Sequence, residues 1–171
     1  MTAATHPILP LVFIGPMAAG KTKIGRRVAK ALDVPFIDTD HRIVEEHGPI
    51  KGIFEQHGED YFRALERQAV AQALTEQAVV SLGGGAVLDA HTQADLAGCS
   101  VVYLSVSSRA VGARIGGGKR PLLRNGIADW KRIYAQRRPV YESLADIGFD
   151  TSHRPLDDIA DDVVNWTKKK S

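Results

Sequence analysis

Residues 15–22 read GPMAAGKT, directly after an apolar run and before a helical pattern. This stretch fits the pattern G-x-x-x-x-G-K-[ST], follows the apolar run LVFI at 11–14, and precedes a helical spacing of Ile24, Val28 and Leu32. In a strand-loop-helix unit of this kind, loop amides and the helix N-terminus bind phosphates, the lysine reaches the β and γ oxygens, and the threonine ligates Mg²⁺. We therefore predict that residues 15–22, the phosphate loop, bind a nucleoside triphosphate with Mg²⁺.

The rest of the chain repeats the alternation of strands and helices. Four more short runs are rich in β-branched and aromatic residues: VPFI at 34–37, AVVSL at 78–82, SVVYLSV at 100–106 and DIGF at 146–149. Apolar strands alternating with helices predict a single α/β domain over residues 1–171, with a central parallel five-stranded sheet flanked by helices in three layers. Ligands of such sheets gather beyond the carboxyl ends of the strands.

The composition excludes several classes of protein. The chain has 171 residues, of which 44% are hydrophobic and 25% charged, as is typical of a soluble globular domain. No apolar run is long enough to span a bilayer, and the N-terminus lacks the pattern of a secretory signal, so we expect a cytoplasmic location and no membrane partner. Cys99 is the single cysteine, which excludes an internal disulfide and a cysteine metal cluster.

Basic residues gather in one segment although the net charge is only +2. Residues 109–138 carry nine Lys or Arg and a single acid, Asp129. Such a segment indicates a polyanion, either nucleic acid or a small phosphorylated or carboxylated ligand. A nucleic-acid surface would interleave exposed aromatic residues, whereas Trp130 and Tyr134 fall on an apolar helical stripe, so we expect no nucleic-acid partner.

Two absences in the sequence narrow the class of phosphate-binding protein. No NKxD-type segment is present to read guanine, which argues against a signalling GTPase. The strand ending at Leu82 runs into Gly83, Gly84 and Gly85 rather than into the acid usual in large ATPase motors. Of the classes of protein that carry this phosphate-binding motif, we therefore favour a small kinase that acts on a metabolite or nucleotide.

The second strand ends in FIDTD, residues 36–40, which contains the carboxylates Asp38 and Asp40. If the strand stays extended here, both side chains point to the same side of the sheet. Two carboxylates at close range repel each other unless cations surround them. We therefore expect positive groups beside this pair.

Six motifs in order resemble the shikimate kinase family across nearly the whole chain: GPMAAGKT, FIDTD, YFRALE at 61–66, GGG at 83–85, GGGKRPLL at 116–123 and RRPVY at 137–141. The resemblance implies a three-layer P-loop kinase fold, with a substrate-binding segment at about 39–68 and a lid at about 114–126. It also implies ATP-dependent phosphorylation of the shikimate 3-hydroxyl with Mg²⁺, and we expect a monomer.

The resemblance assigns site residues by motif. The expected nucleotide-binding residues are Gly15, Ala18, Ala19, Gly20, Lys21, Thr22, Lys23, Arg114, Arg120, Arg154 and Pro155. The expected substrate-binding residues are Asp40, Arg63, Gly83, Gly84, Gly85 and Arg137. The expected catalytic residues are Lys21, Asp40 and Arg120, and the expected metal ligands are Thr22 and Asp38. Arg114 and Pro155 would flank adenine, and the lid residue Arg120 would neutralise the phosphoryl group in transit.

Arginine suits a carboxylate substrate because its planar fork donates two parallel hydrogen bonds. Arg137 falls in the middle of an apolar stripe that includes Trp130 and Tyr141, whereas Arg138 lies about 100° away around the helix. An arginine inside such a stripe needs a buried anionic partner, so Arg137 rather than Arg138 is the expected ligand. For Arg63, the alternative to substrate binding is a surface ion network with Glu59, Glu66 and Arg67, which lie at helical spacing; both can hold if Glu66 orients the arginine toward the substrate.

Three alternatives stay open at this point. The acceptor could be a related polyol acid such as aminoshikimate, quinate or gluconate, since Asp40, Arg63 and Arg137 suit any ring acid with a suitably placed hydroxyl. Asp40 could instead cap the next helix. Finally, Ala18 stands where the family usually has glycine, so the loop conformation could differ.

Overall fold

The structure is a computed structural model that describes residues 9–114 and 126–170. Five parallel strands form one sheet in the order β2-β3-β1-β4-β5. They are β1 Leu11–Ile14, β2 Phe36–Asp38, β3 Val79–Ser81, β4 Ser100–Ser105 and β5 Ile147–Asp150. All five predicted strands are therefore confirmed. The largest difference between a predicted and an observed range is in β2, which was expected at 34–37 and spans Phe36–Asp38. It begins after Pro35 because proline has no amide hydrogen for the ladder.

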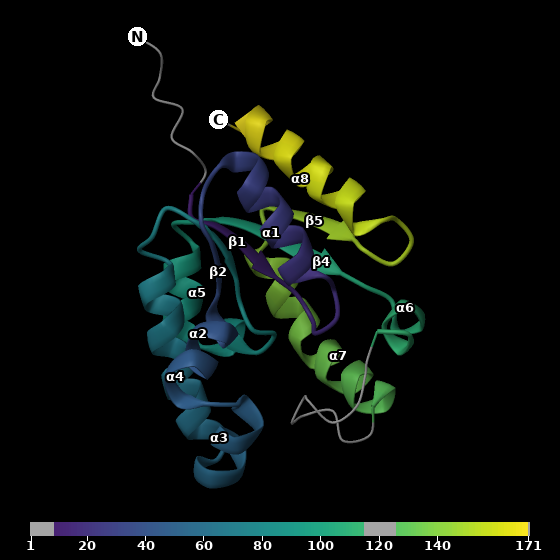
Figure 1. The fold of residues 1–171 in the computed structure, drawn as a ribbon. Helices are drawn as coiled ribbons and strands as arrows, with labels where there is room; N and C mark the ends of the chain where they lie inside the picture. The colour runs from purple at the N-terminus through teal and green to yellow at the C-terminus, as the bar shows by residue number, and fades with distance from the viewer. Residues whose placement is uncertain (1–8, 115–125, 171) are drawn as a thin grey trace.

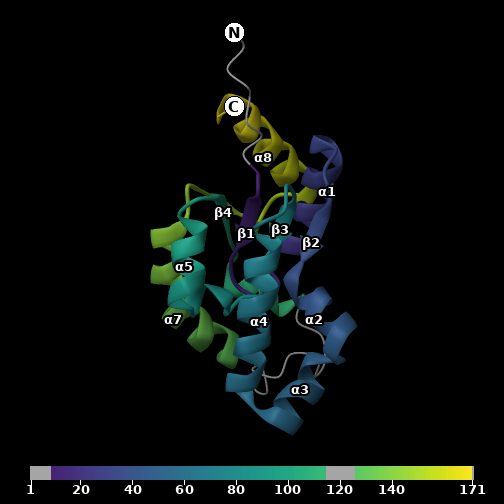
Figure 2. The same cartoon turned by 90° about the vertical axis from the view of Figure 1, so that its left-hand side faces the viewer.

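Eight α-helices and one short 3₁₀ helix are present in the described ranges. They are α1 Lys21–Leu32, α2 Thr39–His47, α3 Ile50–His57, α4 Glu59–Ala73, η1 Ala86–Leu88, α5 Ala90–Leu96, α6 Ser108–Gly112, α7 Ile127–Leu144 and α8 Leu156–Lys170. Helices α1 and α8 lie together on one side of the sheet, and α2 and α3 extend away from it beyond β2 (Figures 1 and 2). No helix in these ranges is long and apolar enough to cross a membrane.

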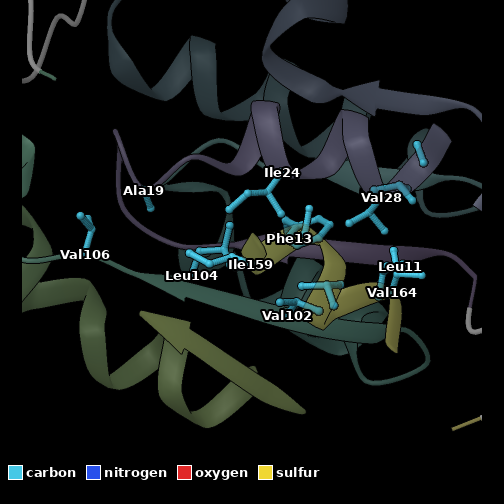
Figure 3. Close-up of a cluster of buried hydrophobic side chains, with 14 of the residues drawn as sticks. Leu11, Phe13, Ala19, Ile24, Val28, Val102, Leu104, Val106, Ile159 and Val164 are labelled. Carbon is cyan, nitrogen blue, oxygen red and sulfur yellow. The ribbon is translucent and has the colours of Figure 1, made fainter. Parts of the chain in front are cut away.

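Strand β1 is buried on both faces and divides the core in two. Leu11 and Phe13 pack with residues of α1 and α8 in one cluster, which Figure 3 shows with Ile24 and Ile159. Val12 and Ile14 point to the opposite face, where side chains of α4, α5 and α7 form a second cluster. Burying both faces of a strand requires the continuous apolar run that the sequence has at 11–14. The phosphate loop thus begins at the end of the most deeply buried strand.

Gly15 starts the loop at a point where the backbones of β1 and β4 are very close. A Cβ atom placed on Gly15 would lie 2.3 Å from the carbonyl oxygen of Leu104, and its φ of 148° is one that L residues rarely adopt. Glycine is required here for both reasons. The loop is therefore anchored at its first residue against the neighbouring strand.

Candidate active site

A cavity of about 420 Å³ opens at the carboxyl ends of the central strands. It brings together residues from three separate parts of the sequence. Its lining includes Ala18, Gly20, Lys21, Thr22, Lys23, Asp38, Asp40, Gly83 and Gly84. All nine are residues that the sequence predicted for the site, and the cavity lies where ligands bind in open parallel sheets.

The phosphate loop is followed directly by α1, as its motif predicted. Within the loop, the Lys21 ammonium donates to the carbonyl oxygens of Gly15 at 2.6 Å and Pro16 at 3.0 Å. These two bonds place the cation over the loop, where phosphate oxygens would lie. Ala18 has a φ of 67°, so the residue that replaces the family's usual glycine still adopts the left-handed conformation.

Asp38 and Asp40 do not lie on one extended strand. Asp38 is the last residue of β2 and the N-cap of α2, and it accepts a hydrogen bond from the backbone N–H of His41 at 3.2 Å. Asp40 already lies in the first helical turn. The expectation of strand alternation was therefore wrong, since the helix begins one residue after Asp38. Capping, which the sequence left open for Asp40, belongs to Asp38.

Asp40 is nevertheless close to Asp38 and deeply placed. Burial raises the pKa of Asp40, the nearby charge of Asp38 raises it further, and the cations Lys21 and Arg63 partly offset both effects. Within residues 9–114 and 126–170, its Oδ1 is the one buried side-chain oxygen or nitrogen with no hydrogen-bond partner. A buried acceptor without a donor is costly, so this atom is available to a ligand hydroxyl.

Each of the three consecutive glycines faces one charged side chain of the site. A Cβ atom would lie 2.7 Å from Asp40 Oδ1 at Gly83, 3.2 Å from an Arg137 nitrogen at Gly84, and 2.6 Å from two Arg63 nitrogens at Gly85. A methyl group at any of the three would therefore crowd that charged group. The triple glycine lets one carboxylate and two guanidinium groups approach the same short piece of backbone.

Helix α7 supplies the cation that the sequence singled out. Arg137 is only 6% exposed, whereas Arg138 is exposed and pairs with Glu142 at 2.8 Å. In the described part of the chain, no carboxylate lies within ion-pair distance of Arg137. The prediction that residue 137 rather than residue 138 is buried is confirmed. A buried guanidinium without a carboxylate partner marks a place for an anionic ligand.

Arg63, on α4, is held by two acids of its own helix. Its guanidinium contacts Glu66 at 2.7 Å and Glu59 at 3.2 Å, so the ion network that the sequence left open for Arg63 forms with these two acids. Glu66 is only 3% exposed, and burial raises its pKa to about 7 although the charge of Arg63 opposes this. The neighbouring Arg67 instead pairs with Asp95 at 2.8 Å. Arg63 is thus oriented toward Gly85 by a carboxylate that titrates near neutrality.

The raised pKa of Glu66 predicts a specific pH dependence of stability. Because the folded state binds this proton more tightly than the unfolded chain, the Glu66 contribution to the free energy of unfolding falls as pH rises from about 4.5 to about 7. In Glu66→Gln this contribution is absent. Across that window, wild type should lose roughly 1 to 3 kcal/mol relative to the variant, because one pKa unit corresponds to about 1.4 kcal/mol. Urea unfolding of both proteins at several pH values measures the difference, and parallel curves would contradict it.

The remaining predicted residues either do not line this cavity or fall outside the described residues. Arg120 and most of the predicted lid, residues 115–125, fall outside them. Arg114 donates to the carbonyl of Ala18 at 2.9 Å, so it contacts the phosphate loop directly. Arg154 forms an exposed ion pair with Asp162 at 2.6 Å. Pro155 immediately precedes α8, whose first residue packs against Gly20.

Three hydrogen bonds from side chains to backbone carbonyls of the site were not predicted from the sequence. Trp130 Nε1 donates to the carbonyl of Met17 at 2.8 Å, Thr151 Oγ1 donates to that of Ala19 at 2.7 Å, and the Tyr141 hydroxyl donates to that of Gly84. Trp130 and Tyr141 were assigned only to the apolar stripe of α7. A side chain that bonds a backbone carbonyl more than fifty residues away leaves no periodic signal in the sequence.

Comparison with known proteins agrees with this geometry. Residues 17–168 match the protein-family model described as "Shikimate kinase". The chain is 44% identical over 154 residues to the shikimate kinase of Thermobifida fusca, and the match covers 88% of this chain and 90% of the relative. It is 45% identical over 148 residues to the shikimate kinase of Mycobacterium avium, and that match covers 84% of each chain. The solved shikimate kinase from Acinetobacter baumannii in complex with shikimate superposes with a TM-score of 0.85 at 30% identity, over 94% of this chain and 93% of that one.

Proposed function

Because the chain belongs to the shikimate kinase family, we propose that its cavity binds ATP and shikimate and transfers the γ-phosphoryl group of ATP to the 3-hydroxyl of shikimate. The observation that carries the proposal is the grouping of Arg137, a buried cation, and the buried Oδ1 of Asp40, an acceptor without a donor, around consecutive glycines. A ring that bears a carboxylate and hydroxyls satisfies both groups at once.

The substrate side of the site is assigned by charge. Arg63 and Arg137 bind the carboxylate of shikimate, and the backbone of Gly83–Gly85 approaches its ring. Asp40 accepts a hydrogen bond from the attacking hydroxyl and orients its oxygen toward the phosphorus. The oxygen–phosphorus bond forms as the bond from phosphorus to the bridging oxygen of ATP breaks, the hydroxyl proton passes to Asp40 or to solvent, and ADP leaves. Such a transition state depends on positioning and charge more than on a strong base.

The nucleotide side is assigned to the phosphate loop. The loop backbone and Lys21 bind the β- and γ-phosphates, with Arg114, Arg154 and Pro155 toward adenine. We retain the prediction that Arg120 neutralises charge on the transferring group. Several other features also remain predictions. They are a substrate-binding segment at 39–68, a lid at 114–126, a monomeric state, a cytoplasmic location, and the lack of nucleic-acid and membrane partners.

Thr22 and Asp38 are the residues that would hold Mg²⁺. The Thr22 hydroxyl donates to Asp38 Oδ2 at 3.3 Å, and both side chains line the cavity beside the phosphate loop. One hydroxyl and one carboxylate suit Mg²⁺, which keeps several waters and is usually bound by few protein oxygens together with substrate phosphates. When bound, the ion neutralises negative charge on the phosphate oxygens.

The variant Asp38→Asn tests this assignment without removing the helix cap. Asparagine caps helices about as well as aspartate, so α2 should be retained. The loss of one carboxylate charge should raise the Mg²⁺ concentration needed for half-maximal activity, while the KM for shikimate changes little. Activity titrated against Mg²⁺ at fixed ATP measures the shift. An unchanged Mg²⁺ requirement would remove Asp38 from the metal site.

The acceptor is tested with a panel of substrates. ADP release from ATP and Mg²⁺ is followed with shikimate, aminoshikimate, quinate and gluconate, each against the background of ATP hydrolysis alone. We expect shikimate to give the highest kcat/KM. If shikimate gave no stimulation while another polyol acid did, the chain would be a sibling kinase for that acid.

A further inference from the structure

The outer side of the phosphate loop is bonded by three side chains from distant parts of the chain. The carbonyl oxygens of Met17, Ala18 and Ala19 accept from Trp130 at 2.8 Å, from Arg114 at 2.9 Å and from Thr151 at 2.7 Å. In a loop that binds phosphate through its amides, the amides face inward, so the carbonyls need other partners. In this loop, each of the three successive carbonyls, those of Met17, Ala18 and Ala19, accepts a hydrogen bond from a side chain.

Trp130 is a rigid donor. It lies in the first turn of α7 and is only 3% exposed, within the same core cluster as Val106 and Val111. Its ring also packs against Tyr134 with a centroid separation of 5.1 Å. Because this packing restricts the ring, its N–H stays aimed at the carbonyl of Met17. The bond joins α7 directly to the loop.

Thr151 is equally constrained. It follows β5 and is completely buried, with its backbone N–H donating to the carbonyl of Ser105 at 2.8 Å. Its hydroxyl lies 2.7 Å from the carbonyl of Ala19 and 3.2 Å from that of Ser105. A hydroxyl has one proton to donate, and the carbonyl of Ala19 is the nearer of the two acceptors. The Thr151 hydroxyl therefore donates its hydrogen bond to the phosphate loop, at the carbonyl of Ala19.

The loop conformation needs such support. Ala18 has a φ of 67°, a region that alanine rarely adopts, and it lies between the carbonyls bonded by Trp130 and Thr151. Without those bonds, the nucleotide-free loop would populate other conformations. Only the fraction of molecules already in the competent conformation binds nucleotide directly, and the apparent affinity falls with that fraction.

We propose that Trp130 and Thr151 are positioning residues for the nucleotide: by bonding the carbonyls of Met17 and Ala19, they keep the phosphate loop in its binding conformation before ATP arrives. This rests on the proposed function in that the loop binds the phosphates of ATP. Neither side chain lines the cavity, so each acts through the loop backbone.

The two tryptophans of the chain supply a matched pair of variants. Trp130→Phe keeps an aromatic ring in the core and removes the N–H. Trp166→Phe changes the other indole, which lies on α8 and packs at the border of the core with Lys170 over its ring. Dissociation constants for Mg·ADP are measured by calorimetry without shikimate, and kcat and both KM values by steady-state kinetics.

Trp130→Phe should weaken Mg·ADP binding about 3- to 10-fold, the range expected for one net hydrogen bond. It should raise the KM for ATP and leave kcat and the KM for shikimate nearly unchanged. Trp166→Phe should change none of these values. If Trp130→Phe lowered only the melting temperature or the fraction of active protein, with wild-type nucleotide affinity, Trp130 would be merely structural and the proposal would be wrong.

Thr151 gives an independent test if the tryptophan variant does not fold. Thr151→Val keeps the shape of the side chain and removes the hydroxyl, whereas Thr151→Ser keeps the hydroxyl. Valine should weaken Mg·ADP binding and serine should restore it; equal affinities for the two variants would contradict the role of Thr151. Because the titration contains no shikimate, a wild-type chain that failed to phosphorylate shikimate would refute the proposed function without altering these ratios.

Discussion

Replacing Asp40 with asparagine is expected to lower kcat for shikimate phosphorylation by about 10² to 10⁴-fold, the range for loss of a group that accepts or guides a proton in the transition state. Asparagine has nearly the same shape, but it lacks the negative charge that makes Asp40 a strong acceptor. Mg·ADP affinity should stay close to wild type, because the phosphate loop and Asp38 are unaltered. Single-turnover kinetics together with nucleotide calorimetry separate the two quantities.

The matched control for Asp40→Asn is Asp38→Asn, two residues away in the same motif. Asp38 bonds Thr22 and caps α2, whereas Asp40 carries the buried oxygen without a donor. Asp40→Asn should lower kcat, whereas Asp38→Asn should raise the Mg²⁺ concentration needed for half-maximal activity. If both showed the same defect, this division of roles would be wrong. Because burial and the charge of Asp38 raise the pKa of Asp40, kcat/KM of the wild type, which reports the pKa values of the free enzyme, should fall as pH drops through that pKa.

The second large effect is expected at Arg137. Arg137→Met fills much of the same space without charge and should raise the KM for shikimate by about 30-fold or more, since truncating one partner of a buried charged pair typically costs roughly 2 to 5 kcal/mol. Nucleotide affinity should change little. In the absence of substrate, the variant should lose little stability, because no carboxylate in the described residues forms an ion pair with this guanidinium and the interactions lost are its hydrogen bond to Tyr141 and its attraction to the charge of Glu66.

Arg138→Met is the matched control for Arg137→Met. It lies next to Arg137 on α7, but it is exposed and pairs with Glu142 on the surface. It should leave the KM for shikimate unchanged. Steady-state kinetics and thermal unfolding of both variants test the pair. Equal effects at the two positions, or a marked loss of stability at Arg137, would show that Arg137 serves the fold rather than a ligand.

The elements that follow from local pattern could be predicted from the sequence. The phosphate motif lies between a continuous apolar run and an amphipathic spacing, and these dictate β1, the loop and α1. The burial of Arg137 followed from the 3.6-residue period of α7 alone. Strand ends were less certain, because they depend on details such as the missing amide hydrogen of Pro35.

What the sequence could not supply are contacts between distant residues. FIDTD contains two possible N-cap residues, and nothing in it shows that the helix begins at Thr39 rather than after Asp40, so the geometry of Asp40 was predicted wrongly although its place in the site was predicted. The match of Gly83, Gly84 and Gly85 to three different charged groups arises only when α2, α4 and α7 converge on one loop. The bond from Trp130 to Met17 spans 113 residues and has no local signature.

Phosphorylation of shikimate in this cavity is tested most directly by identifying the product. Wild-type protein is given limiting ATP with Mg²⁺ and an equimolar mixture of shikimate, quinate and gluconate, and the products are examined by mass spectrometry and ³¹P NMR. We predict one phosphate monoester, on the 3-hydroxyl of shikimate, formed in equal amount to ADP. ADP without phosphorylated shikimate, or phosphate mainly on another acid in the mixture, would contradict the proposed function.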